Sequence, residues 1–216
     1  MAAGVGMLAS FLPGAAPLPI AAALGGFVAG ALVAGRALRR SYPHTRLGLG
    51  NITTLARLAL AMTCLVPLMA GGAASWPVFA IAAITVSMDG VDGWLARRQR
   101  LASAFGARFD MEVDAALALI LAIIAVSGPA GPVAIILGLP RYIFAAAACF
   151  LPWMRRDLPE RFSRKLVCVL QLGVLIALQA PILPPSTALP LVAIAASALV
   201  WSFARDLLWL WQRNRS

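Results

Sequence analysis

Charged side chains are scarce in this chain. Asp, Glu, Lys and Arg together make up 12% of its 216 residues, whereas 62% of the residues are hydrophobic. Soluble domains carry about 25% charged residues, and a soluble domain of this length would have no place to bury so much apolar surface. The scarcity of charge therefore excludes an ordinary soluble protein. It predicts an integral membrane protein, with a length that suits one domain better than two.

Acidic residues are rarer than basic ones. There are 8 Asp and Glu against 18 Lys and Arg, which gives a formal net charge of +10. Such an excess could neutralise nucleic-acid phosphates, but this requires a solvated basic face with interleaved polar residues, and the arginines here stand between apolar runs. We interpret them as a cytoplasmic rim in contact with membrane lipids, and we expect no nucleic-acid partner.

Cysteine and histidine are also few. Cys64, Cys149 and Cys168 each lie in an apolar run without ligand-like neighbours, so we interpret them as small buried residues. They indicate neither a disulfide framework nor a zinc site. The single histidine, His44, stands in a polar loop and is interpreted as solvated or lipid-facing rather than catalytic. The first apolar stretch follows no basic residue and has no clear cleavage site, so we expect a retained span.

Long apolar runs dominate the chain and predict an all-α membrane fold. A helix needs about 20 apolar residues to cross a bilayer, and short connectors, several marked by Gly and Pro, separate the runs. The predicted spans are residues 17–35, 55–72, 76–95, 109–127, 132–153, 166–183 and 188–209.

The basic residues alternate between connectors. The second, fourth and sixth connectors contain no Lys or Arg. Under the positive-inside rule this alternation places the basic connectors in the cytoplasm and the N-terminus outside, in a bacterial-type cytoplasmic membrane. The basic residues of the odd connectors and the C-terminal end are Arg36, Arg39, Arg40, Arg46 and Arg57; Arg97, Arg98, Arg100 and Arg108; Arg155, Arg156, Arg161, Arg164 and Lys165; Arg205, Arg213 and Arg215.

Five of the eight acidic residues fall between positions 89 and 114. Carboxylates in a membrane span are costly and indicate function. On a helix, Asp89 and Asp92 lie about 60° apart, and Asp110 and Asp114 share an arc of about 80° with Gly106. Two antiparallel helices would bring these faces together, and cations would then be needed to bridge the carboxylates. Oxygen ligands favour Mg²⁺, Mn²⁺ or Ca²⁺. The alternative is that the aspartates only neutralise the neighbouring arginines.

These residues resemble the signature of the CDP-alcohol phosphotransferase (CDP-alcohol phosphatidyltransferase) family. That signature is DxxDGxxAR, eight residues, then GxxxDxxxD, and all eight fixed positions match. A weaker resemblance is Asn51-Ile-Thr-Thr54-Leu-Ala-Arg57, which is similar to the polar start of the first core helix in such enzymes. The matching residues are Asp89, Asp92, Gly93, Ala96, Arg97, Gly106, Asp110 and Asp114.

The resemblance implies six core transmembrane helices, commonly in a homodimer, with a site open to the cytoplasm. Residues 49–216 would form this catalytic domain, and residues 1–48 an extra N-terminal transmembrane helix with a basic cytoplasmic connector. Two divalent cations, Mg²⁺ or Mn²⁺, would bind Asp89, Asp92, Asp110 and Asp114, and Asp114 would deprotonate the acceptor. The implied contacts to the CDP-lipid are Asn51, Thr54, Gly93, Arg97 and Ser103.

The implied reaction moves a phosphatidyl, or similar lipid-phosphoryl, group from a CDP-lipid to a small alcohol and releases CMP. Some members of the family instead transfer a CDP-activated headgroup to a lipid alcohol. A transporter also places carboxylates between helices, but those usually lie near mid-membrane. A catalytically inactive scaffold is disfavoured because the signature is complete.

Residues outside the signature leave the acceptor open. Arg141 stands inside a predicted span, where it binds either an acceptor or lipid phosphate or forms a structural ion pair. The basic run after residue 153 serves either topology and anionic headgroups or a phosphorylated acceptor such as glycerol 3-phosphate or inositol phosphate. Glu112 is expected to face away from the metals. The candidate acceptor or phosphate-binding residues are Arg141, Arg155, Arg156 and Lys165.

Overall fold

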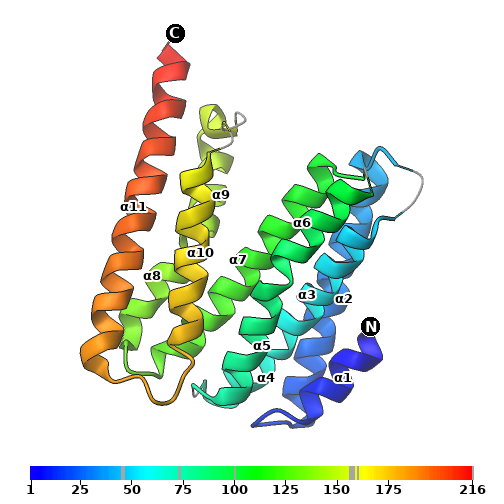
Figure 1. Ribbon diagram of the computed structural model, residues 1–216, viewed down its shortest axis with the longest axis vertical. Coiled ribbons are helices and arrows are strands. Elements are labelled where there is room, and N and C mark those ends of the chain that lie inside the picture. Colours follow the sequence, from blue (N-terminus) through cyan, green and yellow to red (C-terminus); the bar gives the residue numbers. More distant parts are fainter. Residues whose placement is uncertain (45–46, 73, 100, 156–158, 160, 216) are drawn as a thin grey trace.

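The computed structural model describes residues 1–44, 47–72, 74–99, 101–155, 159 and 161–215, without the side chains of residues 91, 92, 96, 155, 214 and 215. The described residues form helices and no strands (Figure 1), which confirms the all-α class. In chain order the helices are α1 (Ala2–Ser10), α2 (Pro17–Ser41), α3 (Leu49–Thr63), α4 (Leu65–Met69), α5 (Trp76–Ser87), α6 (Asp89–Arg98), α7 (Ala104–Val126), η1 (Gly131–Ala134), α8 (Ile135–Gly138), α9 (Pro140–Phe150), η2 (Pro152–Arg155), α10 (Phe162–Ala177) and α11 (Pro185–Arg215).

Every predicted span overlaps helix, but not every helix is long enough to cross a membrane alone. Three helical stretches are long and apolar enough to cross a membrane, and a bent pair of helices gives a fourth if the pair counts as one span. α7 carries three carboxylates, and α10 has only 16 residues. The total of seven spans therefore stays a prediction. The three candidate membrane spans are Pro17–Ser41, Leu49–Met69 and Pro185–Arg213, and the bent pair is Gly131–Gly138 with Pro140–Phe150, at an angle of 51°.

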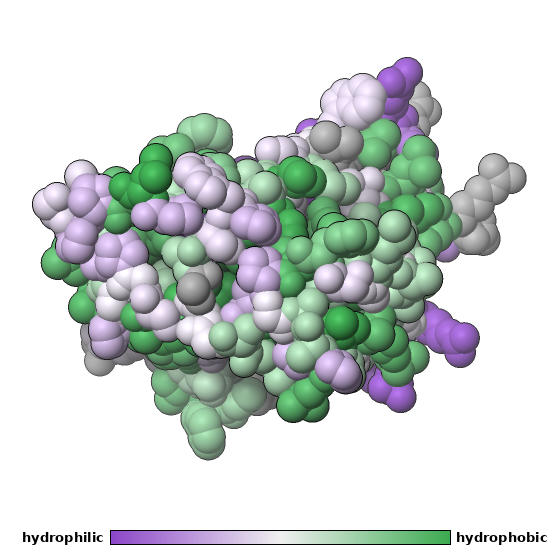
Figure 2. Space-filling model, turned by 90° about the horizontal axis from the view of Figure 1, so that it is seen from below, coloured by the Kyte–Doolittle hydropathy of each residue, from purple (hydrophilic) through white to green (hydrophobic). Residues whose placement is uncertain are grey.

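Large hydrophobic side chains cover much of the outer surface. Phe150, Phe162 and Ile182 are among those that lie exposed, and Figure 2 shows hydrophobic residues over wide parts of the face seen from below. A soluble protein seldom exposes apolar patches on this scale. The surface therefore suits a lipid environment, as the composition predicts.

Helix α7 joins the two halves of the bundle. Figure 1 shows α2, α3, α5 and α6 on one side of it and α8 to α11 on the other, and α7 packs against α2, α3, α8 and α10. Its length places the aspartates near one end and a fully apolar buried stretch near the other. The buried residues of that stretch are Leu117, Ala118, Ile120, Leu121, Ala122, Ile124 and Ala125.

The N-terminal helices pack on the core through small residues. A Cβ added at Gly26 would lie 2.9 Å from the Met62 sulfur, and one at Gly30 would lie 2.9 Å from a Leu58 methyl. This spacing of two glycines four residues apart lets helices approach closely in membranes. Helix α2 therefore contacts the same helix, α3, that carries polar residues of the candidate site. The α1 helix was not expected from the sequence, and the boundary at residue 48 stays a prediction.

Two predicted spans are interrupted at positions that matter for the site. The segment 76–95 breaks at Met88, so Asp89 becomes the first residue of α6. The segment 132–153 bends before Pro140, whose ring cannot continue a straight helix. Just before that bend, a Cβ added at Gly138 would lie 2.7 Å from the Ala122 side chain, so glycine allows α8 to pack tightly on α7.

Candidate active site

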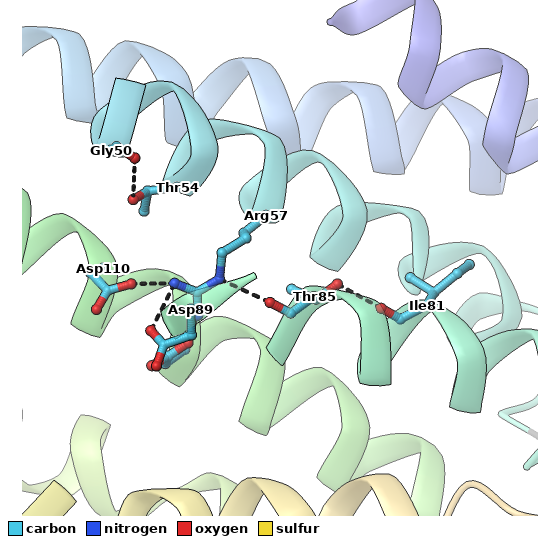
Figure 3. Close-up of polar contacts among 8 residues, drawn as sticks. Gly50, Thr54, Arg57, Ile81, Thr85, Asp89 and Asp110 are labelled. Carbon is cyan, nitrogen blue, oxygen red and sulfur yellow. Dashed lines mark hydrogen bonds and ion pairs between the residues drawn. The ribbon is translucent and has the colours of Figure 1, made fainter. Parts of the chain in front are cut away.

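Arg57 lies at the centre of the aspartate cluster. Its side chain is 0% exposed. Nη1 contacts Asp89 Oδ1 at 3.0 Å and also pairs with the carboxylate of Asp110, whereas Nη2 pairs with the carboxylate of Asp114. Nε donates a 3.0 Å hydrogen bond to the main-chain carbonyl of Thr85. Figure 3 shows the guanidinium between Asp89, Asp110 and the Thr85 carbonyl, so α3 connects α5, α6 and α7 at one point.

The cluster brings three of the four predicted metal ligands together. One carboxylate oxygen from each of Asp89, Asp110 and Asp114 lies within 4.8 Å of the other two. Their side chains are 34%, 33% and 15% exposed, so they remain accessible from one side. The side chain of Asp92 lies outside the described residues. Three hard oxygen ligands at this spacing suit a divalent cation such as Mg²⁺.

A cavity of about 680 Å³ adjoins the aspartates. The three carboxylates line one part of it, and basic side chains from α9 and from the start of α10 line another. The cavity can therefore hold a ligand between a cation-binding wall and an anion-binding wall. Its charged lining residues are Asp89, Asp110, Asp114, Arg141, Arg161, Arg164 and Lys165.

The structure describes the side chains of only two of the four candidate acceptor residues. Lys165 and Arg141 line the cavity, whereas Arg156 and the side chain of Arg155 lie outside the described residues. Arg141 also pairs through Nη2 with the carboxylate of Glu112, so it forms the structural ion pair considered for it, and its acceptor-binding role stays a prediction. Its Nε is buried and has no hydrogen-bond partner in the part of the chain that the structure describes. Glu112 faces away from the aspartates, as expected, and lines a separate apolar cavity between α2, α3 and α7.

Three of the five predicted nucleotide contacts, Asn51, Thr54 and Ser103, lie in the first half of α3 or at the start of α7. Ser103 caps α7 and accepts a 3.1 Å hydrogen bond from the main-chain N–H of Gly106. A Cβ added at Gly106 would lie 3.1 Å from Asn51 Oδ1, so these residues share one small space. Thr54 is buried and donates to the carbonyl of Gly50 at 3.0 Å (Figure 3).

Gly93 and Arg97 adjoin each other on α6. A Cβ added at Gly93 would lie 3.3 Å from Arg97 Nη1, and Arg97 is exposed. The CDP-binding role of all five residues stays a prediction.

Two charged residues of the site region were missed in the sequence. Arg57 was counted with the membrane rim, whereas it is fully buried. Asp206 is 5% exposed and pairs with Arg164 on α10. Both stand inside apolar segments, where an ionisable side chain indicates function or a buried partner, so this signal could have found them.

Other expectations had mixed outcomes. Cys64 is buried and Cys168 half-buried, but Cys149 is exposed, which corrects its interpretation as a buried residue. On a membrane helix an exposed thiol can face lipid. His44 is half-buried and packs edge-on against Tyr42, with ring centroids 5.3 Å apart, rather than standing free in solvent or lipid. A further buried polar contact not considered above joins the turn after α10 to α7, where Gln179 donates a 3.0 Å hydrogen bond to the Leu121 carbonyl.

Comparison with known proteins identifies the family. The family model for CDP-alcohol phosphatidyltransferase matches residues 47–204, which include the aspartates, Arg57 and the basic residues at the start of α10. Neither the curated proteins nor the solved structures contain a match. The matched region spans most of the chain and excludes α1 and α2. The chain therefore belongs to the CDP-alcohol phosphatidyltransferase family.

Proposed function

We propose that this enzyme transfers a phosphatidyl group from a CDP-lipid such as CDP-diacylglycerol to a small alcohol and releases CMP. The observation that carries the proposal is the meeting of Asp89, Asp110 and Asp114 within 4.8 Å at the wall of a cavity that also has a basic lining. Family membership supports phosphatidyl transfer from a CDP-alcohol. The acidic and basic walls of the cavity support a divalent cation requirement and an anionic substrate.

Divalent cations fit the donor set of this site. Asp89, Asp110 and Asp114 would hold them together with Asp92, and Mg²⁺ or Mn²⁺ is favoured because all the ligands are carboxylate oxygens. When bound, two such cations neutralise the pyrophosphate and stabilise the attacking and leaving oxygens. Arg97 would bind a phosphate oxygen of the donor, and Asn51, Thr54, Gly93 and Ser103 would hold the CDP group.

The transfer step exchanges one phosphorus–oxygen bond for another. The acceptor hydroxyl oxygen attacks the phosphorus that carries the lipid, and the bond from that phosphorus to the bridging pyrophosphate oxygen breaks, so CMP leaves. Asp114 takes the hydroxyl proton as the general base, a role that contributes about 10²–10⁴-fold to rate. Of the three described aspartates it is the least exposed, so its carboxylate can work away from bulk water.

The basic lining favours a phosphorylated acceptor such as glycerol 3-phosphate or inositol phosphate. Two of its cations are neutralised by carboxylates, Arg141 by Glu112 and Arg164 by Asp206. Arg161 and Lys165 have no carboxylate partner among the described residues. They stand four residues apart at the start of α10, where the helix dipole also favours an anion.

The topology and assembly belong to the same proposal. We propose that the aspartates and the cavity face the cytoplasmic side of a bacterial-type membrane, with the N-terminus outside, and the alternation of the basic connectors supports this orientation. A homodimer is the proposed assembly.

Lipid product analysis tests this function. The purified full-length protein in detergent is incubated with CDP-diacylglycerol, Mg²⁺ or Mn²⁺ and one acceptor at a time, and the lipid product is identified by its mass. The expected result is CMP together with a phosphatidylated phospho-alcohol. A product formed only from a CDP-headgroup and diacylglycerol would support the alternative transfer, and vesicle uptake without CMP would support a transporter.

A further inference from the structure

We propose that Arg57 is the positioning residue of the aspartate cluster. Its guanidinium would hold the carboxylates of α6 and α7 in the arrangement that takes divalent cations. The proposal rests on the metal-dependent function proposed above. It adds a buried protein cation, supplied by a third helix, that contacts the signature carboxylates directly.

Burial makes Arg57 unusual among the basic residues. Its side chain is 0% exposed, whereas Arg164, which also pairs with a carboxylate, is 37% exposed. A buried charge is tolerated only when it is paired and hydrogen-bonded. Its contacts run to three carboxylates and one carbonyl, so the surroundings of Arg57 are built around its charge.

The guanidinium shape explains why one side chain can organise two helices. Its donors lie in a rigid planar fork. Nη1 faces Asp89 on α6 and Asp110 on α7, Nη2 faces Asp114, and Nε is bonded to the carbonyl of Thr85 on α5. The last bond orients the fork because a main-chain carbonyl cannot swing away. A lysine ammonium is a single point charge and could not hold the same partners at once.

The Arg57 guanidinium only partly neutralises the three carboxylates, so the cluster can still bind a divalent cation. Three carboxylates within 4.8 Å repel one another, and without a cation they would be expected to separate. One guanidinium offsets part of that repulsion and leaves the described group with a surplus of negative charge. The cluster is therefore held together and still attracts divalent cations.

A positioning role and a purely structural role have different consequences. A structural ion pair would affect how much protein folds but not how tightly the folded protein binds metal. A positioning residue changes the metal affinity itself. Groups that orient metal ligands typically contribute about 10- to 100-fold in affinity when they are removed.

The test is Mn²⁺ binding by isothermal titration calorimetry on the full-length protein, with Arg57→Lys and Arg57→Met compared with the wild type. We expect R57K to weaken Mn²⁺ binding about tenfold and R57M about 10- to 100-fold, with monodisperse elution and unchanged helix content by circular dichroism. R57K keeps the positive charge, so if R57M does not fold, the Mn²⁺ affinity of R57K alone distinguishes a positioning role from a structural one. Raising the Mn²⁺ concentration should restore part of the CMP release of R57K, which a loss of folded protein would not allow.

Gln179→Met is the matched control. Gln179 is also fully buried and also ties α7 to another segment, the turn after α10, by a polar bond, but it is not part of the aspartate cluster. It should lower the thermal midpoint and leave the Mn²⁺ affinity unchanged. Wild-type Mn²⁺ affinity in folded R57K, or tighter binding in R57M, would overturn the positioning role. Absence of Mn²⁺ binding by the wild type would instead contradict the proposed metal-dependent function.

Discussion

Arg164 and Asp206 form a two-bond ion pair between α10 and α11. Arg164 Nε lies 3.0 Å from Asp206 Oδ2, and Nη2 lies 3.2 Å from Oδ1. Arg164 also lines the cavity beside the aspartates. Asp206 stands two residues beyond the family-matched region. The pair therefore joins a residue outside the family match to the basic wall of the candidate site.

Asp206→Asn should disturb both stability and acceptor binding. The carboxylate is buried, and a hydrogen bond to a charged group contributes about 1.5–3 kcal/mol, so a loss of that order in unfolding free energy is expected. The KM for a phosphorylated acceptor should rise because Arg164 loses its orientation. Ser163→Ala is the control, since it removes the neighbouring 2.7 Å bond to Arg205 and Ser163 is not among the residues that line the cavity. Equal KM values in the two variants would contradict the link between Asp206 and the acceptor.

Asp114→Asn should abolish most CMP release while the fold is retained. The amide cannot accept the hydroxyl proton, so a rate loss of about 10²–10⁴-fold is expected, measured as CMP formed per minute from CDP-diacylglycerol. Glu112→Gln makes the same chemical change two residues away on the opposite face of α7; because Glu112 pairs with Arg141, it should raise the acceptor KM but keep most of the CMP release at saturating acceptor. Near-normal turnover in D114N would rule out its role as the base.

Lys165→Met should weaken binding of a phosphorylated acceptor. Its ammonium lines the cavity near the start of α10, and a hydrogen bond to a charged group contributes about 1.5–3 kcal/mol, which corresponds to roughly 10- to 100-fold in KM. The CMP-release assay at varied acceptor concentration measures this. Arg40→Met removes a charge from α2, outside the cavity, and should change the KM little. An unchanged KM in K165M would argue for a neutral acceptor.

Gly30→Leu should loosen the N-terminal helix. The new side chain would meet Leu58, since even a Cβ would lie 2.9 Å from its methyl group, and overpacking costs about 1–3 kcal/mol. Gly25→Leu is the matched control because a Cβ there meets nothing within 4 Å. Thermal unfolding in detergent should show a lower midpoint for G30L alone. Identical midpoints would show that α2 does not depend on this contact.

Helical geometry and the signature spacing predicted most of the aspartate cluster. Asp110 and Asp114 share a face of one helix, and Asp89 meets them as expected. The place of Arg57 inside an apolar segment could have indicated a buried partner, but not which one, because its partners lie 32, 53 and 57 residues away. The Arg164–Asp206 pair was missed for a similar reason, since its 42-residue separation becomes a contact only when α10 packs on α11.

The number and integrity of the spans were harder to predict than their positions. Apolar runs located the helices, but hydropathy does not reveal the break at Cys64, where the chain stays apolar. The bend at Leu139 had a visible cause in Pro140. Breaks of this kind depend on packing against neighbouring helices, and the hydropathy of one segment gives no information about that packing.

CMP release from CDP-diacylglycerol, with and without divalent cation, is the sharpest test of metal-dependent phosphatidyl transfer. The purified wild-type protein should form CMP in the presence of Mg²⁺ or Mn²⁺ and a phosphorylated alcohol, together with an equal amount of new phospholipid. Removal of the cation by a chelator should stop both products, and adding Mn²⁺ back should restore them. CMP formation that continues undiminished in the chelator, or an absence of CMP with every acceptor, would contradict the proposed reaction.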